Sequence, residues 1–224
     1  DDVAAFVPVA PPTQKGIFGY GSISGRQSMT NLVNSEGVVA ADVTGVGTVR
    51  TKLAAASFGL DKAIFGYGDV TGGGTGSVTN LVSNSGVVAT DTSGVGTARS
   101  NLAASEFGGD KAIFGYGYSG SSNLSLTNLV SNSGVVAADV TGVGTARRGL
   151  AAARFGTDKG IFAYGLTGSR VSLSNLVSNT GVVASDVTGV GTARNFLEAA
   201  SFGTDKAIFA YGNNGGEVSL KNLV

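Results

Sequence analysis

Short segments in which apolar and small residues alternate recur along the chain, separated by turns rich in Gly, Asn and Ser. In residues 63–67, a period of two places Phe65 and Tyr67 on one face of an extended strand and Ile64 on the other. Further strands of the same unit are expected to end at Val82 and to cover residues 87–91 and 102–105. No segment has the length and apolar spacing of a stable helix. The pattern therefore predicts an all-β protein of short antiparallel strands.

The same succession of segments returns along the chain, which identifies a tandem repeat. Each copy is marked by the sequence Lys-x-Ile-Phe-z-Tyr-Gly, in which x and z are each Gly or Ala. This marker begins at Lys15, Lys62, Lys111, Lys159 and Lys206. The spacing of about 48 residues is typical of propeller repeats, whose units need their neighbours to bury their apolar faces. The repeats are residues 15–61, 62–110, 111–158 and 159–205, with a partial copy over 206–224.

We therefore expect one domain over residues 1–224, a five-bladed β-propeller of four-stranded antiparallel blades closed by the two termini. The alanine-rich strand suits the centre, where blades converge, and the aromatic residues suit the space between blades. Residues 1–14 would complete the partial copy, either as an inner strand over 6–10 or as an outer strand over 3–9. The alternatives are an open β-solenoid and a natural chain that continues beyond Val224.

The order of the segments resembles the kelch-type β-propeller repeat. In one unit the residues that carry the resemblance are Arg99, Ala103, Ala104, residues 113–117 and residues 128–130. Kelch repeats usually have a diglycine and a Trp, whereas this chain has Gly-Tyr-Gly or Ala-Tyr-Gly and no Trp. The stretch GVGTARNFLEAASFGTDKAIFAYG is also similar to tandem propeller repeats of phage and environmental bacterial proteins. That second resemblance implies a binding role on a virion or cell surface, and thus an extracellular or virion-associated location.

The amino-acid composition limits which kinds of ligand binding and catalysis are expected of this chain. The chain has 15 basic and 15 acidic residues, spread along the repeats, which disfavours a nucleic-acid surface. It has no Cys and no His, so the commonest general base and the commonest transition-metal ligands are missing, and we expect neither a metal nor a cofactor. No run approaches the roughly 18 apolar residues of a membrane helix, so no membrane insertion is expected. Residues 1–3 carry no start Met, which indicates a processed or cut N-terminus.

Three sets of polar or aromatic residues repeat with the units. The Asp-Lys pairs before the aromatic strand are expected to be solvated turns. The arginines after Gly-Val-Gly-Thr are expected to join adjacent units through backbone carbonyls or aspartates, with a polar ring for an acidic ligand as the alternative. These residues are Arg50, Arg99, Arg147 and Arg194, with Asp42, Asp91, Asp139 and Asp186 as partners. The tyrosine of each marker is expected to pack in the core, and an aromatic lining for sugars is its alternative.

The candidate binding site lies in the loop between the second and third strands of each unit. This loop differs between units in length and chemistry, and binding residues tend to lie on loops held by a rigid scaffold. The candidate residues are Arg26, Gln27, Asp69, Tyr118, Asn123, Arg170, Asn213, Asn214 and Glu217. The alternative is that these loops vary because nothing constrains them.

The function expected from the sequence is a non-enzymatic recognition or structural module, with a glycan or a surface protein as its partner. Several similar shallow sites on one repeat protein can make weak contacts useful through multivalency. One alternative is a ligand-free repeat scaffold, natural or engineered. The other is an enzyme, which without His or Cys would need a pair of carboxylates, although the acidic residues lie mostly at repeated turn positions.

Overall fold

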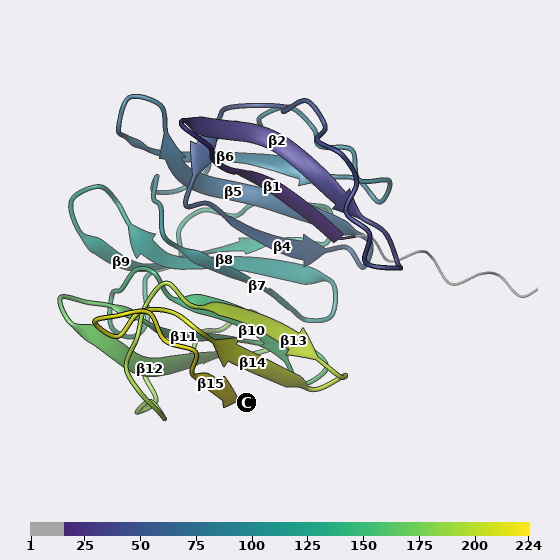
Figure 1. Cartoon of the computed structure of the whole chain (residues 1–224). Coiled ribbons are helices and arrows are strands. Elements are labelled where there is room, and N and C mark those ends of the chain that lie inside the picture. The colour runs from purple at the N-terminus through teal and green to yellow at the C-terminus, as the bar shows by residue number, and fades with distance from the viewer. Residues whose placement is uncertain (1–15) are drawn as a thin grey trace, which may run out of the picture.

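Small antiparallel sheets, which follow the repeat units, make up the fold (Figure 1). The computed structural model describes residues 16–224. Within that range the strands are β1 (Gly16–Ser22), β2 (Arg26–Val33), β3 (Arg50–Thr51), β4 (Ala54–Phe58), β5 (Lys62–Val70), β6 (Thr75–Val82), β7 (Ala103–Phe107), β8 (Lys111–Tyr118), β9 (Asn123–Val130), β10 (Ala151–Phe155), β11 (Lys159–Leu166), β12 (Arg170–Val177), β13 (Glu198–Phe202), β14 (Lys206–Ala210) and β15 (Lys221–Leu223). The all-β prediction is confirmed. Both predicted uses of residues 1–14 lie outside the described residues.

Strand pairing follows the order of the repeats. In the structure a unit is one local group of antiparallel strands, so it begins with the alanine-rich strand that ends the preceding sequence repeat. The third, fourth and fifth units are the three-stranded sheets β7-β8-β9, β10-β11-β12 and β13-β14-β15. The second unit, β4-β5-β6, shares a sheet with β1 and β2, because the short β3 pairs with both β2 and β5. Each unit is therefore a local meander, and the connection between units runs along the sheet edge.

The alanine-rich strands of four units lie side by side at the centre of the described units. β4 packs beside β7, β7 beside β10, and β10 beside β13. All four line one cavity of about 260 Å³. Alanine occupies the same register position in each strand, at Ala55, Ala104, Ala152 and Ala199. The prediction that these small-residue strands converge is confirmed for the four described strands, and their small side chains leave this cavity open.

Main-chain hydrogen bonds join successive units at both ends of the inner strands. At the start of the strands, Asn101 N donates to Lys52 O (2.9 Å) and Gly149 N donates to Asn101 O (2.9 Å). Beyond the end of the strands, Gly59 N donates to Asp110 O (2.7 Å), and the next two units repeat this bond. Each unit is thus fixed to its neighbour by backbone contacts that do not depend on the side chains.

Because of a β-bulge, the side chains of the aromatic strand lie on other faces than predicted. The pairing of β5 with β6 shifts between Gly66 and Gly68, and Tyr67 has a φ of 65°. The extra residue is on β6, and Tyr67, which lies opposite it, has a left-handed backbone that turns its side chain over. Tyr67 therefore joins Ile64 in the core shared with the third unit, while Phe65 packs toward the first unit. The prediction that Phe65 and Tyr67 share a face was therefore wrong, since a strict period of two holds only without a bulge.

The predicted fourth strand, residues 87–91, is not a regular strand and is a second correction. This segment meets β6 at two isolated bridges, Val82↔Val88 and Thr79↔Thr92. Between them the side-chain amide of Asn80 donates to Ala89 O at 3.0 Å. A side chain thus takes a carbonyl that a continuous ladder would use, so each complete unit has three strands and an attached fourth segment.

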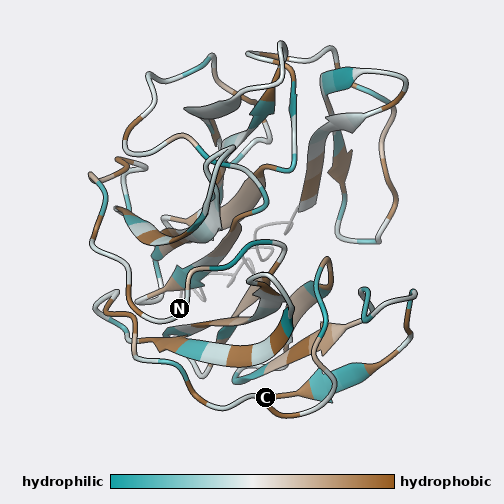
Figure 2. Cartoon of the chain, turned by 90° about the vertical axis from the view of Figure 1, so that its left-hand side faces the viewer, coloured by the Kyte–Doolittle hydropathy of each residue, from teal (hydrophilic) through white to brown (hydrophobic). Residues whose placement is uncertain are grey.

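Aromatic and aliphatic side chains fill the space between neighbouring sheets. One core cluster contains Phe58, Ile64 and Tyr67 from the second unit and Phe114 from the third. Coloured by hydropathy, the strands carry apolar bands that alternate with polar ones (Figure 2). Each core therefore belongs to two units at once, and no unit can bury its apolar faces alone.

Candidate functional site

A buried arginine lies at the centre of each junction between described units. Arg99 has no exposed surface, and its guanidinium lies 4.1 Å over the ring of Tyr67 in the second unit. Its Nη2 donates to Asn128 Oδ1 in the third unit at 2.7 Å. Arg99 therefore joins an aromatic ring of one unit to an amide of the next.

An aspartate completes this junction. Asp139 accepts from Asn128 Nδ2 (3.0 Å), from Thr97 N (3.0 Å) and from Thr97 Oγ1 (2.7 Å). Its carboxylate also lies 4.0 Å from Arg99 Nη1. Because Thr97 and Arg99 belong to the segment that leaves the second unit, the third unit holds this segment with both an amide and a carboxylate. We call the Tyr, Thr, Arg, Asn and Asp of one such set the junction lock.

Burial and charge explain the pKa shifts of the junction lock. Burial lowers the pKa of Arg99, and it raises the pKa of Tyr67, whose hydroxyl donates to Val95 O at 3.1 Å. Partial burial alone would raise the pKa of Asp139, but the hydrogen bonds from Thr97 and Asn128 outweigh burial and lower it. The lock is thus built to hold a carboxylate anion beside a guanidinium cation.

The same lock recurs at other junctions, with two exceptions. Arg50 with Asp91 (3.8 Å) and Arg147 with Asp186 (3.7 Å) repeat it. Arg194 stacks on Tyr164 at 4.0 Å but donates to Phe209 O. Asp42, a further predicted partner, accepts from the side chain of Asn31 instead of from an arginine of the described residues. The predicted structural role of the arginines is confirmed at three junctions through aspartate, and the pairing of Asp42 is corrected.

The predicted turn role of the Asp-Lys pairs is confirmed where contacts are present. Lys62, Lys111 and Lys206 each pair with the preceding aspartate, with N–O distances from 2.8 to 3.0 Å. These side chains are largely exposed, so the pairs contribute little to stability. Asp61 and Asp110 also accept from Asn84 and Asn132.

The predicted site residues gather along one edge of the sheets, where the second strand ends and the third begins. Several of them reach into the next unit. Arg26 Nε donates to Asp69 O (3.1 Å), and Asn123 Nδ2 donates to Leu166 O (3.1 Å) and Thr167 O (2.6 Å). The edge positions thus contribute to the contacts between units as well as facing solvent.

The remaining candidates are divided among local contacts and contacts across junctions. Gln27 donates only within its own loop, to Ile23 O and Gly25 O. Arg170 Nη2 donates to Asn213 Oδ1 at 2.6 Å. Asn213 also bridges to Glu217, while Asn214 is exposed. The structure therefore brings the candidates together in neighbouring pairs and does not form one pocket from all of them.

Two residues of this edge were missed by sequence reasoning. Lys52 pairs with Asp69 at 2.8 Å, and Arg148 lies 4.3 Å over the ring of Tyr118. Arg148 follows the lock arginine directly and Lys52 follows one two residues later, and neither was among the candidate residues. The available signal was variation: where this unit has Arg148, the others have Thr51, Ser100 and Asn195.

The central cavity carries a small polar group at one level. Four residues at one register position of the inner strands are Ser57, Glu106, Arg154 and Ser201. Arg154 Nη1 lies 3.9 Å from Glu106 Oε1, and burial raises the pKa of the Glu106 carboxyl. The opposite charges of Arg154 and Glu106 therefore face each other from neighbouring strands. The other residues that line the cavity are mainly alanines.

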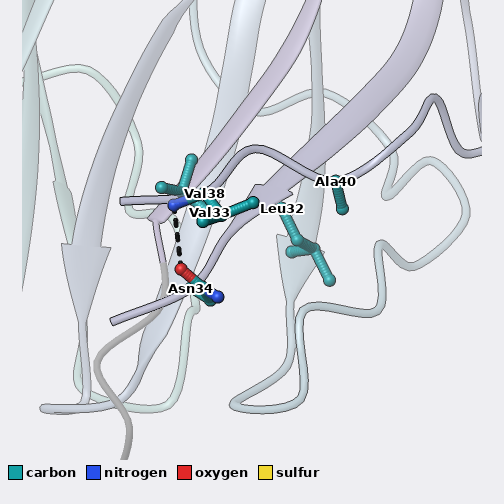
Figure 3. A pocket seen from close by; sticks show the side chains of 5 residues that line it. All are labelled: Leu32, Val33, Asn34, Val38 and Ala40. Carbon is teal, nitrogen blue, oxygen red and sulfur yellow. Dashed lines mark hydrogen bonds between the residues drawn. The ribbon is translucent and has the colours of Figure 1, made fainter. Parts of the chain in front are cut away.

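A second hollow, of about 240 Å³, lies on the first unit beside β2. Its lining is mostly aliphatic, from Leu32, Val33, Val38 and Ala40 (Figure 3). Its hydrogen bond, from Val38 N to Asn34 Oδ1 at 2.9 Å, closes the adjacent turn. Without converging polar groups, this hollow has little that would orient a ligand.

Residues 16–224 contain no group of three or more His, Cys, Asp or Glu placed to hold a metal ion. In the same range, no helix long and apolar enough to cross a membrane is present. When the chain is compared with models of known protein families and with curated proteins, none of them matches. The resemblance to kelch-type repeats therefore stays a prediction.

Proposed function

We propose that this chain is a non-enzymatic recognition module, in which a rigid repeat scaffold presents unit-specific residues to a saccharide. One observation carries the proposal. The arginine that recurs at each described junction is fully buried, whereas the residues that differ between units line one edge of the sheets. Rigid support beneath variable positions is the usual arrangement of a binding surface.

The chemistry of the edge supports a saccharide as the partner. It carries amides, guanidinium groups and an aromatic ring, for example Asn214, Arg170 and Tyr118. Such groups stack on sugar rings and bond to hydroxyls. A display on a virion or cell surface would suit this role, with a surface protein as the other candidate partner.

We further propose that the units close into a five-bladed propeller, each blade with three strands and an attached fourth segment. Support comes from the four inner strands around one cavity and from two exposed aromatic residues. A Tyr of one unit meets a Phe of the next at each described junction, which leaves Phe18 (63% exposed) and Tyr211 (65% exposed) without such partners among residues 16–224. In a closed ring these two would meet, and residues 1–14 would supply the remaining inner strand.

Cross-linking tests the closed ring. The chain has no Cys, so Phe18→Cys combined with Tyr211→Cys can be joined by a short bis-maleimide in dilute protein. A cross-link within one molecule is expected. Leu60→Cys combined with Tyr211→Cys is the control, because Leu60 lies on an exposed turn of the second unit. Cross-links formed only between molecules would contradict closure and favour an open stack of units.

A glycan array tests the recognition function. The purified protein is compared with a trimmed variant in which Tyr118, Asn214 and Glu217, edge residues whose side chains make no hydrogen bond within residues 16–224, are replaced by Ser. The residues that donate across junctions, such as Arg26 and Asn123, stay unchanged, so that the fold is retained. Saccharide binding that weakens on trimming supports the proposal. Binding that trimming leaves intact would contradict a role of these edge residues.

One observation favours the ligand-free scaffold as the second candidate. Arg26, Asn123 and Arg170 donate to the next unit, so the edge has a structural reason to be polar. A silent array for both proteins would favour this scaffold role over recognition.

A further inference from the structure

One pair on the variable edge differs from every other arginine and tyrosine contact in the described residues. The guanidinium of Arg148, at the start of the fourth unit, lies 4.3 Å over the ring of Tyr118, at the end of β8 in the third unit. Both residues are partly exposed, whereas the arginines of the junction locks are fully buried. We call this pair the Tyr118–Arg148 platform.

The guanidinium of this platform has open donors. Within residues 16–224, Arg148 makes no side-chain hydrogen bond and no ion pair, and none of its side-chain nitrogens is buried without a partner. A guanidinium stacked by its face still has its edge N–H groups free, in the fork that matches a carboxylate or sulfate. The ring therefore orients a cation whose donors face solvent.

The other edge cations of the described chain are already matched. Lys52 pairs with Asp69 at 2.8 Å. Arg170 donates to Asn213 Oδ1 (2.6 Å) and to Asn195 Oδ1 (3.2 Å). Arg148 is thus the edge cation whose guanidinium donors are all open, while Arg170 keeps its positive charge but uses donors on two neutral amides.

A second cation lies near the platform on the same sheet. Arg148 and Arg170 are the register partners of Leu166 on its two sides. Two strand spacings place their Cα atoms about 10 Å apart. A chain of acidic sugars, which carries charges at intervals along its length, could contact both positions, while a single small anion would contact one.

The platform is specific to one junction. Where the third unit has Tyr118, the others have Ser22, Asp69, Leu166 and Asn213, and Arg148 is likewise unique to its position. Asn123 holds this junction by donating to the carbonyls of Leu166 and Thr167. The scaffold therefore does not need the pair, since the neighbouring junctions form without it.

We propose that the Tyr118–Arg148 platform binds the carboxylate or sulfate of an acidic saccharide, with Arg170 contacting a second acidic group. This inference rests on the proposed recognition function and names its ligand class. Arg148 would donate two parallel N–H bonds to the anionic group while its face stays on the ring. Because the contact is charge-assisted and partly exposed, binding weakens as salt rises.

The test compares saccharides that differ only in charge. Binding of sulfated galactan, polyuronate and unsulfated galactan oligosaccharides is measured by calorimetry for the full chain, Arg148→Ser and Arg154→Ser. Serine occurs at the position equivalent to Arg148 in the third unit (Ser100) and to Arg154 in the second (Ser57), so both variants suit the fold and change the net charge equally. Arg154 lies in the central cavity and serves as the matched control. Thermal melting checks that both variants are folded.

The expected result is at least a tenfold loss of affinity for the acidic oligosaccharides in Arg148→Ser and less than a twofold loss in Arg154→Ser. Tyr118→Leu, which copies the fourth unit, should also weaken binding, and inorganic sulfate should compete poorly. Acidic saccharides that bind Arg148→Ser unchanged would overturn the platform. Binding of the unsulfated galactan alone would overturn the acidic ligand but keep the recognition function, and the absence of all binding would overturn both.

Discussion

The ring of Tyr67 meets the ring of Phe114 edge to face, with centroids 5.2 Å apart and planes at 66°. Tyr67 also carries the guanidinium of Arg99 on its face, and its hydroxyl donates to Val95 O. One side chain thus contacts the apolar core, the junction lock and the segment between units. The bulge makes this possible, because it turns Tyr67 toward the next unit.

Replacing Phe114 with Ala should lower the free energy of unfolding by about 3 to 5 kcal/mol. The side chain is fully buried between two units and leaves a cavity when it is removed. Denaturant melts measure the change. Leu60→Ala is the control, because Leu60 lies on an exposed turn of the second unit. A change near zero at Phe114 would contradict its place in the core.

The chain contains its own comparison for a glycine beside the aromatic pair. A Cβ on Gly115 would lie 2.6 Å from Phe162 Cζ, and the equivalent residue of the fourth unit is Ala163. There the rings of Tyr164 and Phe209 are farther apart, at 5.8 Å instead of 5.2 Å. The glycine therefore permits the closer ring contact.

Gly115→Ala should consequently move the rings of Tyr116 and Phe162 apart, toward the 5.8 Å of the fourth unit. The expected cost in stability is about 1 to 3 kcal/mol, as for other overpacked sites. A crystal structure and a denaturant melt of the variant provide the two measurements. Unchanged ring positions together with unchanged stability would show that the glycine has no such role.

Removing the lock arginine should be more damaging than removing an edge arginine. Arg99→Met leaves Asn128 and Asp139 without their cation, and breaking a buried pair costs about 3 to 5 kcal/mol. Arg148→Met, on the exposed edge, should change stability by less than about 1 kcal/mol. Thermal and denaturant unfolding of both variants tests this difference. Equal losses of stability in the two variants would show that the junction lock does not depend on a buried guanidinium.

The lock should also make stability depend on pH. The folded-state pKa of Asp139 is below its usual value, because hydrogen bonds outweigh the effect of burial. A carboxyl with a lowered pKa stabilises the fold above its unfolded pKa of about 3.9, and this stability is lost as pH falls through the lower folded value. The free energy of unfolding should therefore fall below about pH 4.

Asp139→Asn should flatten part of this acid dependence, since the amide does not titrate. Burial raises the pKa of Glu106, so its contribution has the opposite sign, and Glu106→Ser should steepen the loss of stability at low pH. Unfolding curves at pH 3 to 7 compare the variants. An acid dependence that stays the same in Asp139→Asn would contradict the proposed effect of the lock.

Much of the architecture followed from local patterns. Glycine-bounded strands such as residues 63–67 and the alanine-rich residues 102–105 were predicted as strands, and β5 and β7 cover them closely. The repeated Arg and Asp positions also predicted pairing between units, which three junctions confirm. These features depend on residue type and spacing, which are visible in one unit and reinforced by its copies.

Two other features, the bulge and the irregular fourth strand, depended on which hydrogen-bond partners the folded backbone finds, and the pattern of apolar and polar residues does not show this. The Gly after each marker Tyr was a possible signal for a bulge, but only the pairing with the third strand decided that Tyr67 would turn over. In the same way, Asn80 looks like an ordinary strand residue in the sequence. Its side-chain amide nevertheless donates to the carbonyl of Ala89, so the fourth segment does not form a regular ladder.

The candidate edge was located by its variation between units, but its most distinctive residue was not. Arg148 follows the lock arginine directly, and only its variation between units distinguishes it from Arg147 in the sequence. The sequence by itself determined the repeat, the strands and the alanine-rich centre, because these follow from local spacing. Only the tertiary structure decided that Arg147 is buried in a lock while Arg148 stacks on Tyr118 at the surface, because the neighbouring unit supplies both partners.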